Sequence, residues 1–297
     1  MMLSDVEVNE QLNEHIIIFW FTLIVGIVTF SIAWFKGFFK SFKVVYLPYV
    51  KGYEVLAAFF IFLFTEAILV PLFATGAYYL TTGENLLGYK LGTLQVAWLN
   101  AATILAGFVS IIVVYYMIPR ERRDAIIQQT PGAFLSNVRV GIIGWFISFP
   151  LVMAFSQVIA IIVLLIFKQS MVDQTAVRHM KALMDHPVLF SFTTLELITI
   201  VPFTEEFLFR GLLQSWIKRR CGRATVAIVV SSFIFALFHF SFSQGVTNIE
   251  LISALFMLSC FLGYLYEQQR SLWANVSLHG FFNLVSVVFI FKDNLIK

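Results

Sequence analysis

Long runs of apolar residues, separated by short polar or basic segments, dominate the chain. A hydrocarbon core about 30 Å thick is crossed by about 20 helical residues, and apolar runs of this length are typical of transmembrane helices. The pattern predicts eight of them, at roughly 15–35, 55–80, 94–118, 140–167, 188–215, 224–242, 249–266 and 272–291. We therefore predict an all-α, polytopic membrane protein with about eight transmembrane helices and a buried polar cavity.

Composition supports a chain surrounded by membrane lipid. Of the 297 residues, 60% are hydrophobic and 12% are charged, and phenylalanine alone supplies 34 positions. The charged fraction is about half of the roughly 25% that is typical of soluble globular domains. A protein with this much apolar surface is not expected to stay dispersed in water, so lipid is the first predicted partner.

Basic residues alternate between the two ends of the predicted helices. Lys and Arg are enriched in the cytoplasmic loops of membrane proteins. One side carries thirteen of them and the other carries six. The thirteen are Lys36, Lys40, Lys43, Lys51, Arg120, Arg122, Arg123, Arg139, Lys218, Arg219, Arg220, Arg223 and Arg270. We therefore predict that both termini are non-cytoplasmic.

The N-terminal segment and the loops bear on localisation. The first fifteen residues are acidic and precede an apolar run too long for a signal-peptide core, so we expect no cleavage. The compact loops favour a multi-pass protein of a cell (inner) membrane. Because membrane topology explains the basic clusters and the net charge of +3, we expect no nucleic-acid partner.

The longest polar connection runs from Lys168 to His186. It divides the chain into two predicted units, residues 1–167 with four helices and residues 188–297 with four more. The second unit holds most of the polar residues at membrane depth, so we expect the chemistry there.

Few ionisable or amide side chains fall within the predicted helices. Such groups are costly in lipid, so each is a candidate for function. All five Asp residues lie in loops or near chain ends, which excludes an intramembrane aspartyl protease, and the Gly-x-Ser-x-Gly, His-Glu-x-x-His and Gly-x-x-x-x-Gly-Lys motifs are missing. The remaining candidates are Glu66, Glu196, Glu205, Glu206, Arg210, His239, His279 and Asn283.

The segment "VPFTEEFLFRG" places a proline directly before an acidic pair. Pro202 removes an amide donor, so we expect a bend there. Residues four apart share a helix face, so Glu206 and Arg210 can form an ion pair while Glu205 points elsewhere. An unpaired buried carboxylate suits proton transfer better than a paired one, which makes Glu205 the better candidate base.

Two later helices carry polar residues at matching depth. Counted at about 1.5 Å per residue from the nearest basic loop, Glu205 and Asn283 lie about 20 Å deep, His239 about 24 Å and His279 about 14 Å. All four fit within one bilayer of about 30 Å. Three adjacent antiparallel helices could therefore bring a Glu, two His and an Asn together.

Such a cluster would support hydrolysis of an amide in either of two ways. In the first, Glu205, His239 and His279 bind Zn²⁺, with water as the fourth ligand. In the second, no metal is needed: Glu205, helped by a histidine, deprotonates water, while a neutral histidine and the Asn283 amide donate to the oxyanion. These residues are compatible with both the zinc-dependent and the metal-free reaction.

Three motifs together resemble a known family. They are "EEFLFR" from Glu205 to Arg210, "FALFH" from Phe235 to His239, and "HGFFN" from His279 to Asn283. In this order, on three apolar helices, they are similar to the type II CaaX prenyl endopeptidase and bacteriocin-processing family (CPBP) of intramembrane proteases. The resemblance covers roughly residues 188–283.

The resemblance implies a multi-helix membrane fold and a peptidase that acts on a membrane-associated peptide or protein. By motif position, Glu205 is the base, Glu206 and Arg210 support it, and His239, His279 and Asn283 complete the site. Family members trim prenylated tails or process other peptides, so the substrate stays open. The resemblance does not decide between zinc and metal-free catalysis, and we favour the metal-free form.

Other classes of protein fit part of the pattern. A transporter or channel could use the buried Glu and His side chains as an ion path, and a family member without activity could serve as a scaffold. The polar residues cluster on the last four predicted helices without a matching half, which disfavours transport. We expect Glu196 to form a hydrogen bond between helices, and we assign Glu66 to hydrogen bonding or to the cavity lining.

Overall fold

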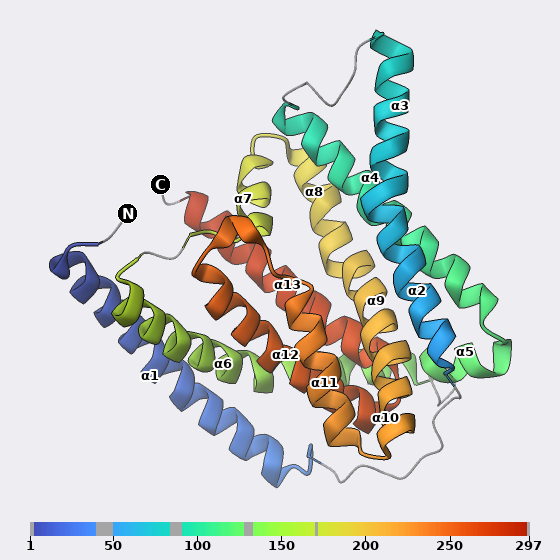
Figure 1. Ribbon diagram of the computed structural model, residues 1–297. Coiled ribbons are helices and arrows are strands. Elements are labelled where there is room, and N and C mark those ends of the chain that lie inside the picture. The colour runs from blue at the N-terminus through green and yellow to red at the C-terminus, as the bar shows by residue number, and fades with distance from the viewer. Residues whose placement is uncertain (1–2, 40–49, 84–90, 128–132, 170–171, 296–297) are drawn as a thin grey trace.

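The computed structural model describes residues 3–39, 50–83, 91–127, 133–169 and 172–295, and these residues form helices without β-strands (Figure 1). The first half contains α1 (Asp5–Phe35), α2 (Gly52–Phe64), η1 (Thr65–Leu69), α3 (Val70–Thr82), α4 (Thr93–Met117), α5 (Arg120–Ile127), α6 (Phe134–Phe167) and α7 (Thr175–Ala182). The second contains α8 (Pro187–Leu195), η3 (Glu196–Ile200), α9 (Val201–Glu206), η4 (Phe207–Gln214), α10 (Ser215–Cys221), α11 (Ala224–Leu237), η5 (Phe242–Gln244), α12 (Thr247–Gln269) and α13 (Leu272–Leu295).

Seven helical stretches of the described chain are long and apolar enough to cross a membrane. Two of them are continuous rods of several segments, Gly52–Thr82 and Pro187–Cys221. These findings confirm an all-helical, polytopic membrane protein. The sixth predicted helix, at 224–242, is wrong in length, because α11 has 14 residues and ends at Leu237.

The early end of α11 has a tertiary cause. The side-chain oxygen of Asn248 on α12 accepts a hydrogen bond from the Ser241 N–H at 3.0 Å, and its Nδ2 donates to the Ser241 carbonyl at 2.7 Å. The side chain thus satisfies both backbone groups of Ser241, which a continuing helix would otherwise pair. Local hydrophobicity carries no sign of this contact.

Each rod contains a π-helical turn before a proline. η1 ends two residues before Pro71, and η3 ends two residues before Pro202. A proline has no N–H to give to the preceding turn, so carbonyls there lack their helical donors. In the second rod, Asn283 Nδ2 donates to the Leu197 carbonyl at 2.8 Å, and the Ile198 carbonyl lies against the backbone of Gly280.

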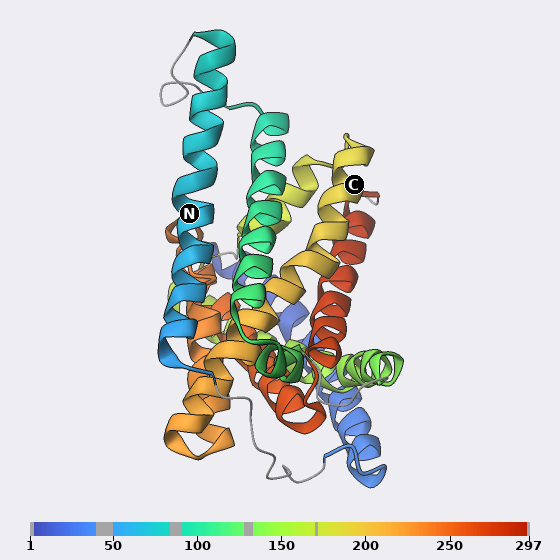
Figure 2. The same cartoon turned by 90° about the vertical axis from the view of Figure 1, so that its right-hand side faces the viewer.

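The helices form one bundle in which the two predicted units pack together. α6 of the first unit contacts both α12 and α13 of the second, and α1 lies along α6. The first rod packs beside α4, and its α3 end projects beyond the rest of the bundle in both views (Figures 1 and 2). The division into two units stays a prediction.

The two ends of the bundle differ in charge. α5 and the turn between α10 and α11 lie at the lower end in both views, whereas the last turn of α3 and the first turn of α4 lie toward the upper end (Figures 1 and 2). The basic residues of α5 and α10 therefore share one end of the molecule, as the predicted alternation requires. Large apolar side chains such as Phe21, Phe73 and Phe233 are exposed on the periphery, as expected for lipid contact.

Candidate active site

The site lies where α9, α11 and α13 approach one another. Glu205 stands between two imidazole rings: its Oε1 is 3.7 Å from His239 Nε2, and its Oε2 is 3.7 Å from His279 Nε2. The three side chains come from residues up to 74 positions apart in the chain. The expected meeting of a Glu and two His is thus present in the geometry.

Glu206 is the buried centre of a separate network. Its Oε2 lies 3.2 Å from Arg210 Nε and accepts a hydrogen bond from Asn275 Nδ2 at 3.1 Å, while its Oε1 lies 3.0 Å from His279 Nδ1. The Glu206 side chain is 0% exposed and that of Glu205 is 21% exposed. The two neighbouring carboxylates therefore occupy different environments, one enclosed and paired, the other reachable.

Arg210 is held from several sides. Its Nη2 donates to Ser259 Oγ at 2.8 Å, and its guanidinium carbon lies 4.7 Å from the centre of the Phe235 ring. A buried cation needs such partners because desolvation opposes its charge. Phe235 thus does more than fill space, since its ring faces Arg210 and its carbonyl contacts His239.

Both histidines have their tautomer set by a neighbour. His239 Nδ1 lies 2.9 Å from the Phe235 carbonyl, and His279 Nδ1 faces the Glu206 carboxylate. A carbonyl and a carboxylate oxygen can only accept, so Nδ1 carries the proton in each ring. In their neutral forms, both rings therefore present an Nε2 lone pair toward Glu205.

The Asn283 side chain has a hydrogen-bond partner in the second rod. The hydrogen bond that the structure gives its Nδ2 goes to the Leu197 carbonyl in η3. Asn283 therefore contacts the rod that carries Glu205, about two helical turns before that residue along the chain. Its contact satisfies a backbone group near the proline bend.

Asn275 is the residue that sequence reasoning missed. It is fully buried, and its Nδ2 bridges Glu206 and the Leu262 carbonyl. It stands four residues before His279, so both point from the same face of α13. The four-residue spacing from His279 was the sign of Asn275 in the sequence. It is informative only if His279 has already been assigned to the site.

Glu196, another acidic candidate, forms no hydrogen bond with this network. Glu196 is 1% exposed, and neither of its carboxyl oxygens has a hydrogen-bond partner among the described residues. The predicted hydrogen bond between helices is therefore wrong for Glu196. Glu196 begins the π-helical turn η3, in which side chains project in different directions from those of a regular α-helix.

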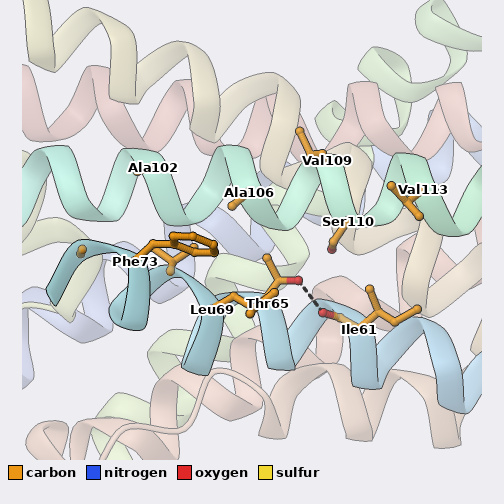
Figure 3. A pocket seen from close by; sticks show the side chains of 11 residues that line it. Ile61, Thr65, Leu69, Phe73, Ala102, Ala106, Val109, Ser110 and Val113 are labelled. Carbon is orange, nitrogen blue, oxygen red and sulfur yellow. Dashed lines mark hydrogen bonds between the residues drawn. The ribbon is translucent and has the colours of Figure 1, made fainter. Parts of the chain in front are cut away.

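A groove lies between the first rod and α4. It encloses about 740 Å³ between α2, η1 and α3 on one side and α4 on the other, with Thr65 and Ser110 among mainly apolar lining residues (Figure 3). Glu205 and both site histidines are outside this lining. The groove is therefore separate from the polar cluster, whose Glu206 and Arg210 are buried.

The side chains of Glu205, His239 and His279 raise the question of whether the site can bind a metal ion. Two Nε2 lone pairs and a carboxylate are ligand types that suit Zn²⁺, and the partners at each Nδ1 are of the kind that orients metal-bound histidines. The described residues, however, contain no group of three or more His, Cys, Asp or Glu side chains placed to hold a metal ion. The arrangement as it stands does not fit a metal site.

Comparison with known proteins agrees with the three motifs. Residues 187–285 match the family model described as "Type II CAAX prenyl endopeptidase Rce1-like". No curated protein and no solved structure matches the chain. The matched region begins with α8 and ends within α13, so it holds every member of the polar cluster described above. Over residues 187–285 the chain is thus similar to the type II CaaX prenyl endopeptidase family.

Proposed function

We propose that the protein hydrolyses a peptide bond of a membrane-associated peptide or protein, with Glu205 as the base that activates water. The observation that carries this proposal is the position of Glu205, which is partly exposed and faced by two histidine Nε2 atoms at 3.7 Å. Atoms at that separation are not directly hydrogen-bonded, and a water molecule can bridge them. Glu206 already balances Arg210, which leaves Glu205 free for proton transfer.

The proposed reaction needs no group beyond water and the side chains. Water gives one proton to Glu205 while its oxygen forms a bond to the peptide carbonyl carbon, and the carbonyl electron pair moves onto the oxygen. The C–N bond then breaks, and Glu205 returns the proton to the leaving nitrogen. A histidine Nε2 orients the attacking water by accepting its second hydrogen.

The tautomers refine the role of the histidines. Because Nδ1 holds the ring proton, a neutral His239 or His279 accepts at Nε2 and does not donate to an oxyanion. Donation from Nε2 requires the doubly protonated ring, whose positive charge would also stabilise the oxyanion. We assign Asn283 as a positioning residue, since its bond to Leu197 supports the rod that carries Glu205.

Cleavage by the purified protein in lipid nanodiscs tests the proposal. Prenylated and unprenylated membrane peptides would be supplied to the wild type and to Glu205→Gln. General-base catalysis typically contributes about 10²- to 10⁴-fold, so we expect a loss of kcat/KM in that range. Glu250→Gln is the matched control, because that carboxylate accepts a hydrogen bond from Ser156 on α6, away from the site.

Addition of a chelator separates the two forms of chemistry. Activity that survives chelation supports the metal-free reaction, whereas loss on chelation and recovery with Zn²⁺ would contradict it. Full activity of Glu205→Gln would remove Glu205 from its assigned role. Proton-coupled uptake into liposomes, without cleavage of any peptide, would instead support a transporter.

We infer that the basic end of the bundle faces the cytoplasm, which places both termini outside. The native cysteines can test this inference, because Cys221 is exposed beside the turn between α10 and α11 and Cys260 is partly buried on α12. A membrane-impermeant maleimide should label Cys221 only after the cells are permeabilised. Labelling of Cys221 in intact cells would reverse the orientation.

A further inference from the structure

A buried polar seam joins the second rod to α12 beyond the acidic pair. Every fourth residue after Glu206 directs a polar side chain toward α12, and these residues are Arg210, Gln214 and Lys218. Their partners on α12 are again four residues apart, and they are Ser259, Gly263 and Glu267. All eight residues of η4 are buried. Polar groups enclosed in this way are costly unless each finds a partner, so the seam constrains how the rod and α12 fit together.

Gln214 is the central member of this seam, and its side chain is 0% exposed. Its Nε2 donates to the Gly263 carbonyl at 3.0 Å and to Glu267 Oε1 at 3.2 Å. Its Oε1 accepts a hydrogen bond from Ser231 Oγ on α11 at 3.3 Å. Both amide hydrogens and the amide oxygen are therefore used, and one side chain ties η4 to two other helices.

A glycine on α12 makes room for the Gln214 amide. A β-carbon built at Gly263 would lie 2.8 Å from Gln214 Oε1 and 3.0 Å from Ile228 Cγ2 on α11. The second rod, α11 and α12 therefore approach one another closely at this level. A side chain on α12 at this position would push the glutamine amide away from its hydrogen-bond partners.

Arg210 connects the seam to the candidate active site. It stands four residues before Gln214, and it is bound to α12 through Ser259. The Arg210 guanidinium pairs with Glu206, whose other carboxylate oxygen lies 3.0 Å from His279 Nδ1. His279 in turn faces the proposed base through its Nε2. A shift of the rod against α12 would therefore reach this histidine through a continuous series of contacts.

We propose that Gln214 is a positioning residue of the Glu205 site. By fixing η4 against α11 and α12, it keeps Arg210 and Glu206 where they orient His279. This inference rests on the proposed role of Glu205 in peptide hydrolysis. A side chain that does not touch the substrate can act in this way, because a displacement of about 1 Å at the reacting groups can cost about 10²-fold in rate.

The Nδ1 proton of His279 reports on this series of contacts without an activity assay. A proton held between a ring nitrogen and a carboxylate resonates far downfield, and its resonance moves upfield as the hydrogen bond lengthens. Solid-state NMR of the whole protein in lipid, labelled with ¹⁵N-histidine, would locate the resonance that is lost in His279→Gln. We expect this resonance to move upfield in Gln214→Met, which keeps the length of the side chain and removes its hydrogen bonds. An unchanged His279 resonance in Gln214→Met would overturn the proposal.

Gln157 supplies the matched control for this measurement. It is 7% exposed on α6, and its Oε1 lies 2.7 Å from His15 Nδ1 on α1, so Gln157→Met also removes a buried glutamine between helices. That variant should move the His15 resonance and leave the His279 resonance unchanged. Movement of the His279 resonance in both variants would indicate a general loosening of the bundle and would overturn the specific role of Gln214.

The rate of peptide cleavage supplies the second readout. At equal concentrations of folded protein, Gln214→Met should lower kcat by about 10- to 10²-fold and leave KM unchanged, because no contact with the substrate is lost. Gln157→Met should keep the kcat of the wild type.

A second variant displaces the same amide without removing it, and it carries the test if Gln214→Met does not fold. Gly263→Ala should also lower kcat and move the His279 resonance upfield, and its effect should add nothing in the Gln214→Met background. Gly26→Ala is the matched control, because its added carbon would meet Leu151 Cδ2 at 2.7 Å between α1 and α6. A Gly263→Ala variant that behaves like Gly26→Ala in both measurements would contradict the proposal.

The outcomes separate this inference from the proposed function. A wild type that cleaves peptides, loses activity in Glu205→Gln and keeps its kcat in Gln214→Met would retain Glu205 as the base and reject the role of Gln214. A His279 resonance that moves in Gln214→Met, without cleavage by any variant or by the wild type, would support the series of contacts and reject the peptidase. A resonance that does not move rejects the role of Gln214 whether or not cleavage is observed.

Discussion

The two proline-broken rods use the same local device with different surroundings. Both Gly52–Thr82 and Pro187–Cys221 carry a π-helical turn just before a proline and a glutamate near that turn. The second rod is enclosed by α4, α11, α12 and α13, whereas the first packs mainly on α4 and leaves α3 beside an open groove. The proline breaks each helix locally. The role of the break depends on the neighbouring helices, whose side chains pair with the freed backbone groups.

The largest expected difference concerns the ion pairs. Removal of one partner from a buried pair costs about 3–5 kcal/mol, because the remaining charge stays buried without compensation. We expect Arg210→Leu to lower the free energy of unfolding by that amount. Arg122→Leu, which breaks a 2.8 Å pair with Glu54 beside the start of the first rod, should cost less, because these side chains are 19% and 10% exposed and the remaining charge can still reach water.

Unfolding in detergent, followed by circular dichroism at fixed lipid content, measures both variants. Similar losses for Arg210→Leu and Arg122→Leu would show that the two rods depend equally on their charges. Glu206→Leu combined with Arg210→Leu should recover part of the loss, since a pair of apolar residues leaves no buried charge.

The next effect concerns close packing between helices. A β-carbon at Gly280 would collide with the Ile198 carbonyl, which is backbone and cannot turn aside. We expect Gly280→Ala to cost about 1–3 kcal/mol and to reduce cleavage by moving α13 away from η3. Gly76→Ala in the first rod meets open space, so thermal unfolding and activity should match those of the wild type.

A further effect, in the same range as that of Gly280→Ala, concerns the carbonyl freed by the proline. Asn283→Leu removes the donor to the Leu197 carbonyl, and an unsatisfied buried acceptor costs about 1–3 kcal/mol. Pro202→Ala restores a backbone N–H, so the cost of Asn283→Leu should shrink in that background. A double-mutant cycle on unfolding free energies measures the coupling. Additive losses would separate Asn283 from the proline break.

Sequence reasoning succeeded where the relevant information was local. The apolar runs predicted the helices, and the spacing of Glu206 and Arg210 predicted their ion pair, because i,i+4 neighbours meet on any helix. Matched depth also predicted that Glu205, His239 and His279 could approach one another. These features need only the rise per residue and the period of a helix.

The remainder depends on how helices are rotated against each other. The bond from Asn275 to Glu206 joins residues 69 positions apart, and the contact of Asn248 with Ser241 ends α11 from outside. We expected Glu196 to form a hydrogen bond between helices, but its carboxyl oxygens have no partner among the described residues. No periodicity along the chain encodes such rotations.

The short α11 has a consequence for the surrounding bilayer. Its 14 residues span about 21 Å, whereas the 31-residue first rod spans about 46 Å. Lipids next to a helix shorter than the hydrocarbon thickness compress, and those beside a longer one stretch or let it tilt. The outer face of α11 is apolar, and the turn that follows it carries His239, which is 32% exposed. We therefore expect a thinned patch of membrane beside His239, which shortens the path that water must travel to reach a peptide bond held in lipid.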